Sequence, residues 1–308
     1  MDGDNRTNPI NFFLMGFFSH NVASGFIYII IFIIFFIALI ANGAMIFLIN
    51  TDTQLQTPMY FLLSHLSFID IIYISTIVPK MLVSYFSAQE TISFVACTAQ
   101  YFLYQTFVGA EFFLLGLMAY DRYVAICHPL HYSVLMSRQI CLIILFLLTP
   151  ITMSLPFCAS NKINHFFCEA PTMLRLACGD KAIYEMVMYI CCVMMLLIPF
   201  SVVIISYTKI LITVHQMNSP EGGKKALATC SSHIIVVTLF YGAALYTYML
   251  PQLYHTPVKD KIFSAFYTIL TPMINPLIYS LRNKDVTNAM KRVLGRCKCN
   301  IKTVCKRL

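Results

Sequence analysis

The sequence predicts an all-α fold, a seven-transmembrane helix bundle with its N-terminus outside and a short amphipathic helix after the seventh span. Hydrophobic residues make up 59% of the 308 residues and charged residues only 11%, whereas a soluble domain would carry about 25% charged residues. The apolar residues are gathered into runs of about 20 residues, the length that crosses a bilayer as a helix. Composition and run length together therefore predict a multi-pass membrane protein.

Seven apolar runs follow one another with short connections. They cover residues 25–49, 58–84, 98–126, 140–155, 183–214, 231–250 and 262–279. Pro150 and Pro156 interrupt the fourth run, but a membrane helix tolerates such kinks where its neighbours satisfy the freed carbonyls. We therefore divide the chain into an extracellular arm over 1–24, a seven-span domain over 25–281 and a cytoplasmic amphipathic helix with a basic tail over 282–308.

Basic residues set the orientation of the bundle. With the N-terminus outside, 14 of the 21 lysines and arginines fall on the inner side and six on the outer side, and Lys80 near the outer end of the second run completes the total. The positive-inside rule favours this arrangement. No basic region with a cleavage site precedes residue 25, so we expect the first run to act as an uncleaved signal anchor.

The outer side carries a glycosylation sequon and four cysteines. Asn5 begins the sequence Asn-Arg-Thr, which is a glycosylation acceptor when it faces outside; the alternative is an unmodified, disordered arm. The outer cysteines are Cys97, Cys158, Cys168 and Cys178. We expect disulfides in this oxidising environment, although four cysteines allow three pairings and spacing alone does not choose among them.

The tail after residue 281 carries nine basic residues and one acid, Asp285. One helical face collects apolar residues, namely Val286, Met290, Val293 and Leu294. This pattern predicts a short helix on the inner leaflet, with its basic face toward anionic lipid. Three cysteines are candidate palmitoylation sites, namely Cys297, Cys299 and Cys305. The alternative is a disordered basic tail with free thiols.

Five motifs occur in order along these spans. The third run ends in Asp121-Arg122-Tyr123, inside the longer stretch from Met118 to Tyr132. The others are Pro58-Met59-Tyr60-Phe61-Leu62, the stretch from Lys225 to His233 and the stretch from Pro272 to Asn283. The outer loop between Cys158 and Cys178 adds the sequence His165-Phe166-Phe167-Cys168-Glu169. With seven spans and an outer N-terminus, the chain resembles a rhodopsin-like G-protein-coupled receptor, and within that class it resembles the odorant receptor family from Phe12 to about Leu294.

Two positions depart from the family pattern. His65 stands where the family usually has an asparagine, and the first inner loop, residues 51–57, lacks the usual basic residues. The second departure could weaken membrane anchoring or surface expression.

The resemblance implies a G-protein switch at the inner end of the bundle. Arg122 matches the arginine that Asp121 holds at rest and that is freed when the sixth helix swings outward; Tyr123 completes the motif. Tyr207 and Tyr279 match tyrosines that support the active arrangement. Considered alone, Arg122 would also fit an interfacial arginine whose head reaches the membrane surface.

Asp70 and Glu111 are the only acids deep within the runs. Buried carboxylates must pair, bind a cation or take up a proton. The resemblance implies that they face each other in the bundle centre, with Asn42 and Asn275 nearby. We expect a sodium or proton site that biases the resting state; the alternative is a hydrogen-bonded acid pair that shares one proton.

The resemblance also implies a ligand pocket in the outer halves of the helices. Its residues are Tyr104, Gln105, Val108, Gly109, Cys192, Met195, Tyr241, Ala244, Tyr248, Ala265 and Thr268. This set contains no charge and a few hydroxyls, which suits a small, neutral, mostly apolar volatile ligand. The alternative at each position is ordinary helix packing. By the same resemblance, Cys97 pairs with Cys168 and Cys158 with Cys178.

Cys191, Cys192, Met194 and Met195 form a sulfur-rich patch. Soft sulfur ligands favour copper(I), so a metal-assisted response to thiols is conceivable. Packing by polarisable side chains is the favoured explanation, because no histidine lies in the same outer segment.

The expected function is that of a plasma-membrane odorant receptor that activates a stimulatory heterotrimeric G protein and raises cyclic AMP. Its partners would be an odorant, the G protein and lipid, with no nucleic acid. A receptor of the same fold that senses a metabolite outside the nose is the main alternative. A transporter or channel would show repeats or charged rings along a pore, and the enzyme signatures Gly-x-Ser-x-Gly and His-Glu-x-x-His are absent.

Overall fold

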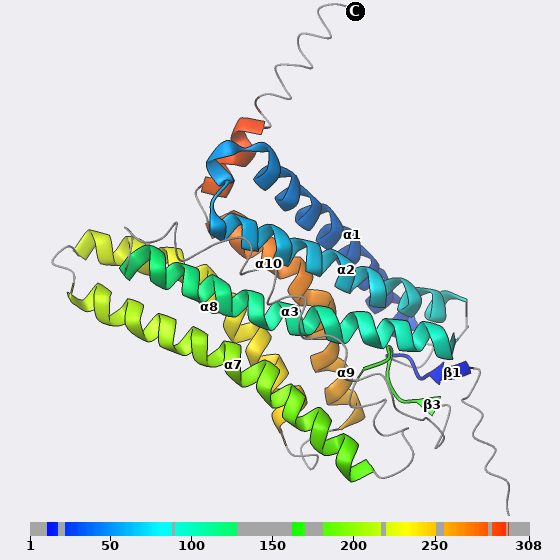
Figure 1. The fold of residues 1–308 in the computed structure, drawn as a ribbon. Helices are drawn as coiled ribbons and strands as arrows, with labels where there is room; N and C mark the ends of the chain where they lie inside the picture. The colour runs from blue at the N-terminus through cyan, green and yellow to red at the C-terminus, as the bar shows by residue number, and fades with distance from the viewer. Residues whose placement is uncertain are drawn as a thin grey trace, which may run out of the picture.

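The computed structural model describes residues 11–17, 22–87, 90–127, 162–169, 181–216, 220–250, 256–282, 285–293 and 295. Long helices lie side by side in an elongated bundle (Figure 1). They are α1 (Val22–Thr51), α2 (Pro58–Phe86), α3 (Phe94–Cys127), α7 (Lys181–Gln216), α8 (Pro220–Met249), α9 (Pro257–Ala265) and α10 (Thr271–Arg282). The short 3-10 helix η1 (Thr53–Leu55) joins α1 to α2, and the π-helical segment η4 (Phe266–Leu270) joins α9 to α10 into one span.

Six helices in the described residues are long and apolar enough to cross a membrane. They confirm the first, second, third, fifth, sixth and seventh predicted spans, and the fourth span lies outside the described residues. Large apolar side chains face outward, such as Val95, which is 76% exposed, and Ile40, which is 70% exposed. Asp70 and Glu111, in contrast, are at most 2% exposed. Apolar side chains facing outward match lipid tails, which are as apolar as leucine.

The third helix lies at the centre of the bundle, where it contacts α2, α7 and α8. A close approach between α3 and α7 depends on Gly116. A Cβ atom at this position would lie 3.1 Å from Cβ of Pro199 and 3.3 Å from its carbonyl oxygen. Because the proline backbone cannot move aside as a flexible side chain could, glycine sets the spacing between the two helices.

A three-stranded sheet lies at the outer end of the bundle beside α3, away from the C-terminus (Figure 1). Its order is β2 (Thr91–Ser93), β1 (Asn11–Leu14), β3 (Lys162–Ile163), with β1 antiparallel to β2 and parallel to β3. The prediction of an all-α chain with a polar N-terminal arm missed this sheet. In β1, Phe12 and Leu14 are buried and their neighbours are exposed, as expected for a strand with one buried face.

The arm also reaches the seventh span. Nζ of Lys261 in α9 donates hydrogen bonds to the backbone oxygens of Met15, at 3.0 Å, and Gly16, at 2.8 Å. The first helix begins at Val22, within the 1–24 range assigned to the arm. The described part of the arm, residues 11–17, is therefore tied to the bundle.

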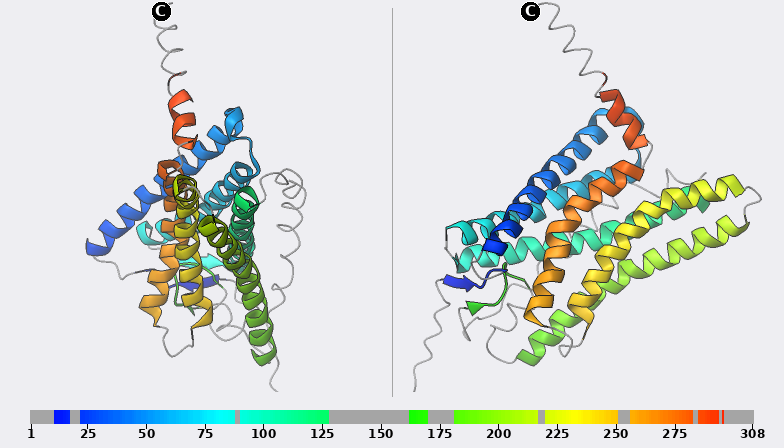
Figure 2. Two further views of the ribbon diagram at one scale, coloured as in Figure 1. Left: turned by 90° about the vertical axis from the view of Figure 1, so that its left-hand side faces the viewer. Right: turned by 180° about the vertical axis from the view of Figure 1, so that it is seen from behind.

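Residues 285–293 form a helical segment after α10, beside the inner end of α1 (Figure 2). Val286 and Ala289 are fully buried on its inner face, whereas Met290 is 38% exposed. Arg292 donates to Oδ2 of Asp52 from Nη2 at 2.7 Å and from Nε at 2.9 Å. A helix is thus present in the described part of the tail, with Val286 packed against the protein and Met290 facing outward. Arg292, from the predicted basic face, pairs with Asp52, and contact of the helix with the inner leaflet stays a prediction.

Candidate functional site

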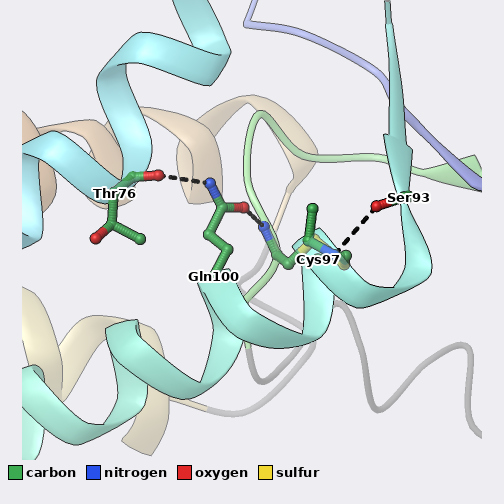
Figure 3. The surroundings of a disulfide bond; sticks show 6 residues. Thr76, Ser93, Cys97 and Gln100 are labelled. Atoms are coloured by element: carbon green, nitrogen blue, oxygen red, sulfur yellow. Dashed lines mark hydrogen bonds between the residues drawn. A yellow bond between two sulfur atoms is a disulfide. The ribbon is translucent and has the colours of Figure 1, made fainter.

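A disulfide between Cys97 and Cys168 fixes the second outer loop to the start of α3. The pairing is the one that the family resemblance implied. Gln100, one turn further along α3, holds the loop a second time (Figure 3). Its Oε1 accepts a hydrogen bond from the backbone N–H of Cys168 at 2.9 Å, and its Nε2 donates to the carbonyl oxygen of Thr76 in α2 at 3.0 Å. The loop, α2 and α3 are therefore joined at one point.

The residue after this disulfide, Glu169, places a carboxylate inside the outer end of the bundle, where it is 2% exposed. Its Oε2 accepts hydrogen bonds from the hydroxyls of Ser264, at 3.2 Å, and Tyr267, at 3.1 Å. Nε2 of His165 lies 3.3 Å from its Oε1. The predicted pocket set contained no charge, so Glu169 is a residue that sequence reasoning missed. Its position next to Cys168 was the signal that could have found it.

Three tyrosine hydroxyls extend from this carboxylate across the bundle. The hydroxyl of Tyr104 in α3 donates to that of Tyr267 at 3.1 Å, and the hydroxyls of Tyr104 and Tyr248 in α8 lie 3.0 Å apart. The structure thus brings together two predicted pocket residues, Tyr104 and Tyr248, and adds Tyr267. Loop, third helix, sixth span and seventh span meet in this row of hydroxyls.

Deeper in the bundle, Tyr241 of α8 connects to α3. Its hydroxyl donates to the carbonyl oxygen of Phe112 at 3.0 Å, and its ring lies 5.1 Å from that of Phe112 and 5.2 Å from that of Phe200 in α7. Gly109 lies against Met195, whose methyl group occupies the space that a Cβ at position 109 would need. The third, fifth and sixth spans therefore meet at these residues.

The other predicted pocket residues are distributed around these contacts. Val108, Ala244 and Thr268 are buried, Gln105 and Ala265 are half-buried, and the side chain of Cys192 lies outside the described part. The hydroxyl of Thr268 donates a hydrogen bond to the carbonyl oxygen of Ser264 at 2.6 Å, so its hydrogen bond lies within its own span. Gln105 differs, because its buried Oε1 has no hydrogen-bond partner among the described residues.

The acidic pair predicted in the bundle centre lies with its two asparagines between α1, α2, α3 and α10. Nδ2 of Asn275 donates to both carboxylate oxygens of Asp70, at 3.2 and 3.4 Å. Glu111 lies close enough to Asp70 to interact electrostatically. Asn42 donates to the carbonyl oxygen of Pro272 at 2.8 Å. Two buried oxygens in this group, Oε1 of Glu111 and Oδ1 of Asn42, have no hydrogen-bond partner in the described chain.

The predicted switch residues gather at the inner end. Asp121 and Arg122 are buried at the end of α3, and Tyr279 is 2% exposed on α10. Arg122 lies within electrostatic range of Tyr279 and of Tyr207 in α7. The hydroxyl of Tyr207 lies 2.6 Å from Nδ1 of His233 in α8, and His233 is fully buried. Sequence reasoning quoted His233 only as the end of a family motif.

Tyr123 and Asp121 are the other two predicted switch residues. Tyr123 is half-buried, with its ring 6.0 Å from that of Tyr120 on the same helix. The predicted contact in which Asp121 holds Arg122 stays a prediction.

The remaining predictions fall largely outside the described residues. They include Asn5, Cys158, Cys178, Cys297, Cys299, Cys305 and the side chain of Cys191. Met194, from the proposed sulfur patch, is 52% exposed. Within the described ranges, no group of three or more histidine, cysteine or acidic residues is arranged to hold a metal ion.

Residues 30–297 match the family model described as olfactory receptor. The chain belongs to the olfactory receptor family. It is 71% identical to human olfactory receptor 2T6 over 308 residues, 96% of this chain and 100% of that protein. It is 69% identical to human olfactory receptor 2T1 over 304 residues, 95% of this chain and 82% of that protein.

The fold of this olfactory receptor is shared with squid rhodopsin. The crystal structure of that protein superposes with a TM-score of 0.67 at 18% identity, covering 91% of this chain and 88% of squid rhodopsin. Family membership makes the protein a multi-pass receptor of the plasma membrane, with no enzymatic activity of its own, and implies an odorant as ligand and coupling to a G protein.

Proposed function

We propose that this olfactory receptor binds a small, mostly apolar volatile molecule within its outer half and activates a stimulatory heterotrimeric G protein, which raises cyclic AMP. The observation that carries the proposal is the inner cluster of Arg122, Tyr207, His233 and Tyr279, defined here as the switch cluster. It draws on the third, fifth, sixth and seventh spans. Burying an arginine among membrane helices costs free energy, and an arginine retained there marks a functional site.

Ligand binding and G-protein binding would be linked by a population shift. A ligand moves the equilibrium only by its difference in affinity between the two arrangements. Tyr241 is the residue proposed to sense the ligand. It lies on α8 between Tyr248, toward the outer end, and His233 of the switch cluster, toward the inner end, and its hydroxyl is hydrogen-bonded to α3 at Phe112. Movement of α8 away from α3 would break this bond.

Asp70 and Glu111 belong to the same proposal as a site for a sodium ion or a proton. The residues fit a small hard cation, because oxygen ligands suit such ions and two buried oxygens, on Glu111 and Asn42, have no protein partner among the described residues. The pair links α2 to α3 and, through Asn275, to α10. A cation or proton there would stabilise the packed, resting arrangement of these helices.

Cells that express the full chain test the function. A panel of neutral volatiles, thiols with and without copper included, is applied while cyclic AMP and surface level are measured. We expect a response to a subset of the panel that disappears in cells lacking the stimulatory α subunit. A response that persists in those cells would contradict the coupling, and silence across the panel at full surface level would contradict the ligand class.

A further inference from the structure

The first stretch of the described arm, residues 11–14, is anchored at the outer end of the bundle. It forms β1, the central strand of the sheet, with Phe12 and Leu14 on its buried face. Both side chains belong to a small core that also contains the disulfide-bonded Cys97 and Cys168. Moving this stretch away would expose two large apolar side chains to water, which costs free energy in proportion to the apolar area. Residues 11–14 are therefore the fixed part of the arm.

The next three residues, Met15, Gly16 and Phe17, are defined here as the strap. The backbone N–H of Met15 donates to the carbonyl oxygen of Ile163 in β3 at 2.8 Å. Lys261 of α9 donates to the backbone oxygens of Met15 and Gly16. Met15 is 48% exposed, and the other two strap residues are half-buried. Because water competes for hydrogen bonds at the surface, each of these bonds contributes little net free energy.

Phe17 connects the strap to a line of aromatic rings that ends at the predicted pocket. Its backbone N–H donates to the hydroxyl of Tyr28 in α1 at 3.3 Å, and its ring centroid lies 5.3 Å from that of Phe166 in the outer loop. The centroid of Phe166 lies 4.9 Å from that of Phe167, which lies 5.0 Å from that of Tyr104. Phe17 is half-buried, whereas the other three rings of the line are buried. The line therefore runs inward from the surface, with the loop rings outside Tyr104.

The two ends of this line differ in how they are held. Cys168 follows Phe167 directly, and it is fixed by the disulfide to Cys97 and by the hydrogen bond from its backbone N–H to Gln100. At the other end, Phe17 is held by a ring contact and by hydrogen bonds near the surface. The strap is thus the part of this closure that can move without breaking a covalent bond.

The packing beneath the strap is incomplete. A small pocket lies there, and Gly16, Tyr28, Ser84 and Phe166 are among the residues that line it. Oγ of Ser84 is buried without a hydrogen-bond partner in the described part of the chain. A close-packed interior resists movement, and a pocket removes contacts from the atoms that line it. The strap therefore loses fewer contacts on release than a closely packed segment would.

We propose that the strap closes the outer entrance to the ligand site, and that its release from Lys261 and Phe166 admits a small, mostly apolar molecule. Lys261 and Phe17 are positioning residues in this scheme. Lys261 holds the backbone of the strap, and Phe17 holds the loop rings over Tyr104. The proposal rests on the proposed function, because it needs a ligand site in the outer half of the bundle. It adds one step, strap release, that precedes binding and dissociation alike.

A thiol reagent tests the closure without a known ligand. Ala244→Cys places a cysteine at a buried position of the predicted pocket in α8. Intact cells that express the full chain are treated with the membrane-impermeant reagent trimethylammonioethyl methanethiosulfonate. Mass spectrometry of the purified receptor then follows the peptide that contains residue 244, so reaction at native cysteines is counted separately. Because the reagent enters only while the strap is released, the reaction rate follows the released fraction.

Paired variants in the Ala244→Cys background locate the cause. Phe17→Ala and Lys261→Ala should each increase the rate about threefold to tenfold, the range for loss of an aromatic pair or a hydrogen bond. Phe13→Ala and Lys259→Ala are the matched controls, because Phe13 lies on the exposed face of β1 and Lys259 is exposed on α9. Both controls should react at the parent rate. Phe17→Tyr keeps the ring and should do the same.

An agonist adds a readout that a merely structural role would not change. For any volatile of the panel that activates the receptor, Lys261→Ala should speed both the onset of G-protein recruitment and its decay after washout. The potency should change less than about twofold, because strap release precedes both binding and dissociation and does not favour one bound state over another.

The outcomes separate the closure from the function on which it rests. Equal reaction rates in Phe17→Ala, Lys261→Ala and the parent would overturn the proposal, and so would controls that react as fast as these two variants. Faster reaction in the two variants alone would support it even if no volatile activates the receptor, a result that would count against the proposed function. A fall in potency with unchanged onset and decay would mean that the arm only stabilises the outer end, and would overturn the closure.

Discussion

The outer and inner ends of the bundle hold their buried polar groups differently. At the outer end, Glu169 accepts from two hydroxyls and Gln100 bridges two backbone groups beside the disulfide of Cys168. At the inner end, Nε of Arg122 and the hydroxyl of Tyr279 are buried without a hydrogen-bond partner in the described residues. The outer end is joined by a disulfide in addition to hydrogen bonds, whereas Arg122 and Tyr279 of the switch cluster each keep a buried polar atom without a hydrogen-bond partner among the described residues.

This difference indicates which end moves. A buried polar group without a partner costs about 1–3 kcal/mol, and a rearrangement that supplies a partner recovers this free energy. A second arrangement that supplies these partners, such as one that contacts a G protein, would therefore lower the free energy of the switch cluster. The cross-linked outer end would lose hydrogen bonds by moving, so it serves as the fixed part against which α8 moves.

The largest expected effect comes from the switch cluster. Arg122→Ala should abolish the cyclic AMP response while leaving measurable receptor at the cell surface, because it removes the charge at the centre of the moving end. Lys291→Ala, at an exposed position of the helix after α10, is the matched control and should signal normally. A normal agonist response from Arg122→Ala would remove the basis for assigning motion to the inner end.

The disulfide is the next strongest constraint. Cys97→Ser should block folding or trafficking, because loss of a native disulfide costs about 2–5 kcal/mol, and Cys168→Ser should do the same. Surface staining measures the effect. Cys127→Ser is the control, since Cys127 is a free cysteine. Normal surface levels for Cys97→Ser would show that the outer end is held without its covalent link.

Gln100 should have a smaller effect of the same kind. Gln100→Ala leaves the N–H of Cys168 and the carbonyl oxygen of Thr76 without this partner, so we expect a loss of about 1–3 kcal/mol in stability. Thermal unfolding of purified receptor measures it. An unchanged melting temperature would mean that the hydrogen bonds of Gln100 to α2 and to the loop do not stabilise the outer end.

The smallest effect belongs to the ion pair between Asp52 and Arg292. The side chain of Arg292 is 35% exposed, and such pairs contribute about 1 kcal/mol or less. A double-mutant cycle with Asp52→Ala and Arg292→Ala should give a coupling free energy in that range. A coupling of several kcal/mol would mean that the inner end is held as firmly as the outer end.

The spans could be predicted from sequence because bilayer thickness fixes the length of each apolar run. The sheet could not, since its strands come from residues 11–14, 91–93 and 162–163 and pairing between such distant segments leaves little local pattern. The π-helical segment over residues 266–270 was missed for a related reason, because one extra residue per turn does not change hydropathy.

Part of the arrangement of the candidate site could be predicted from the positions of residues along their spans. Tyr104 contacts Tyr248, and Asn275 contacts Asp70, because the two residues of each pair lie at the same depth in neighbouring spans. Glu169 was quoted from its motif but not placed near the pocket, since its position depends on a disulfide that folds the loop inward. Loop placement depends on tertiary contacts, which periodicity does not record.

Distances at both ends, measured with and without an agonist, test the central claim most directly. Spin-labelled unnatural amino acids at Ala125 and Leu227 report on the inner ends of α3 and α8, and labels at Val95 and Leu245 report on their outer parts; all four positions are exposed. We predict that agonist lengthens the inner distance and leaves the outer one unchanged. An outer distance that changes as much as the inner one, or an unchanged inner distance in a signalling receptor, would contradict the account.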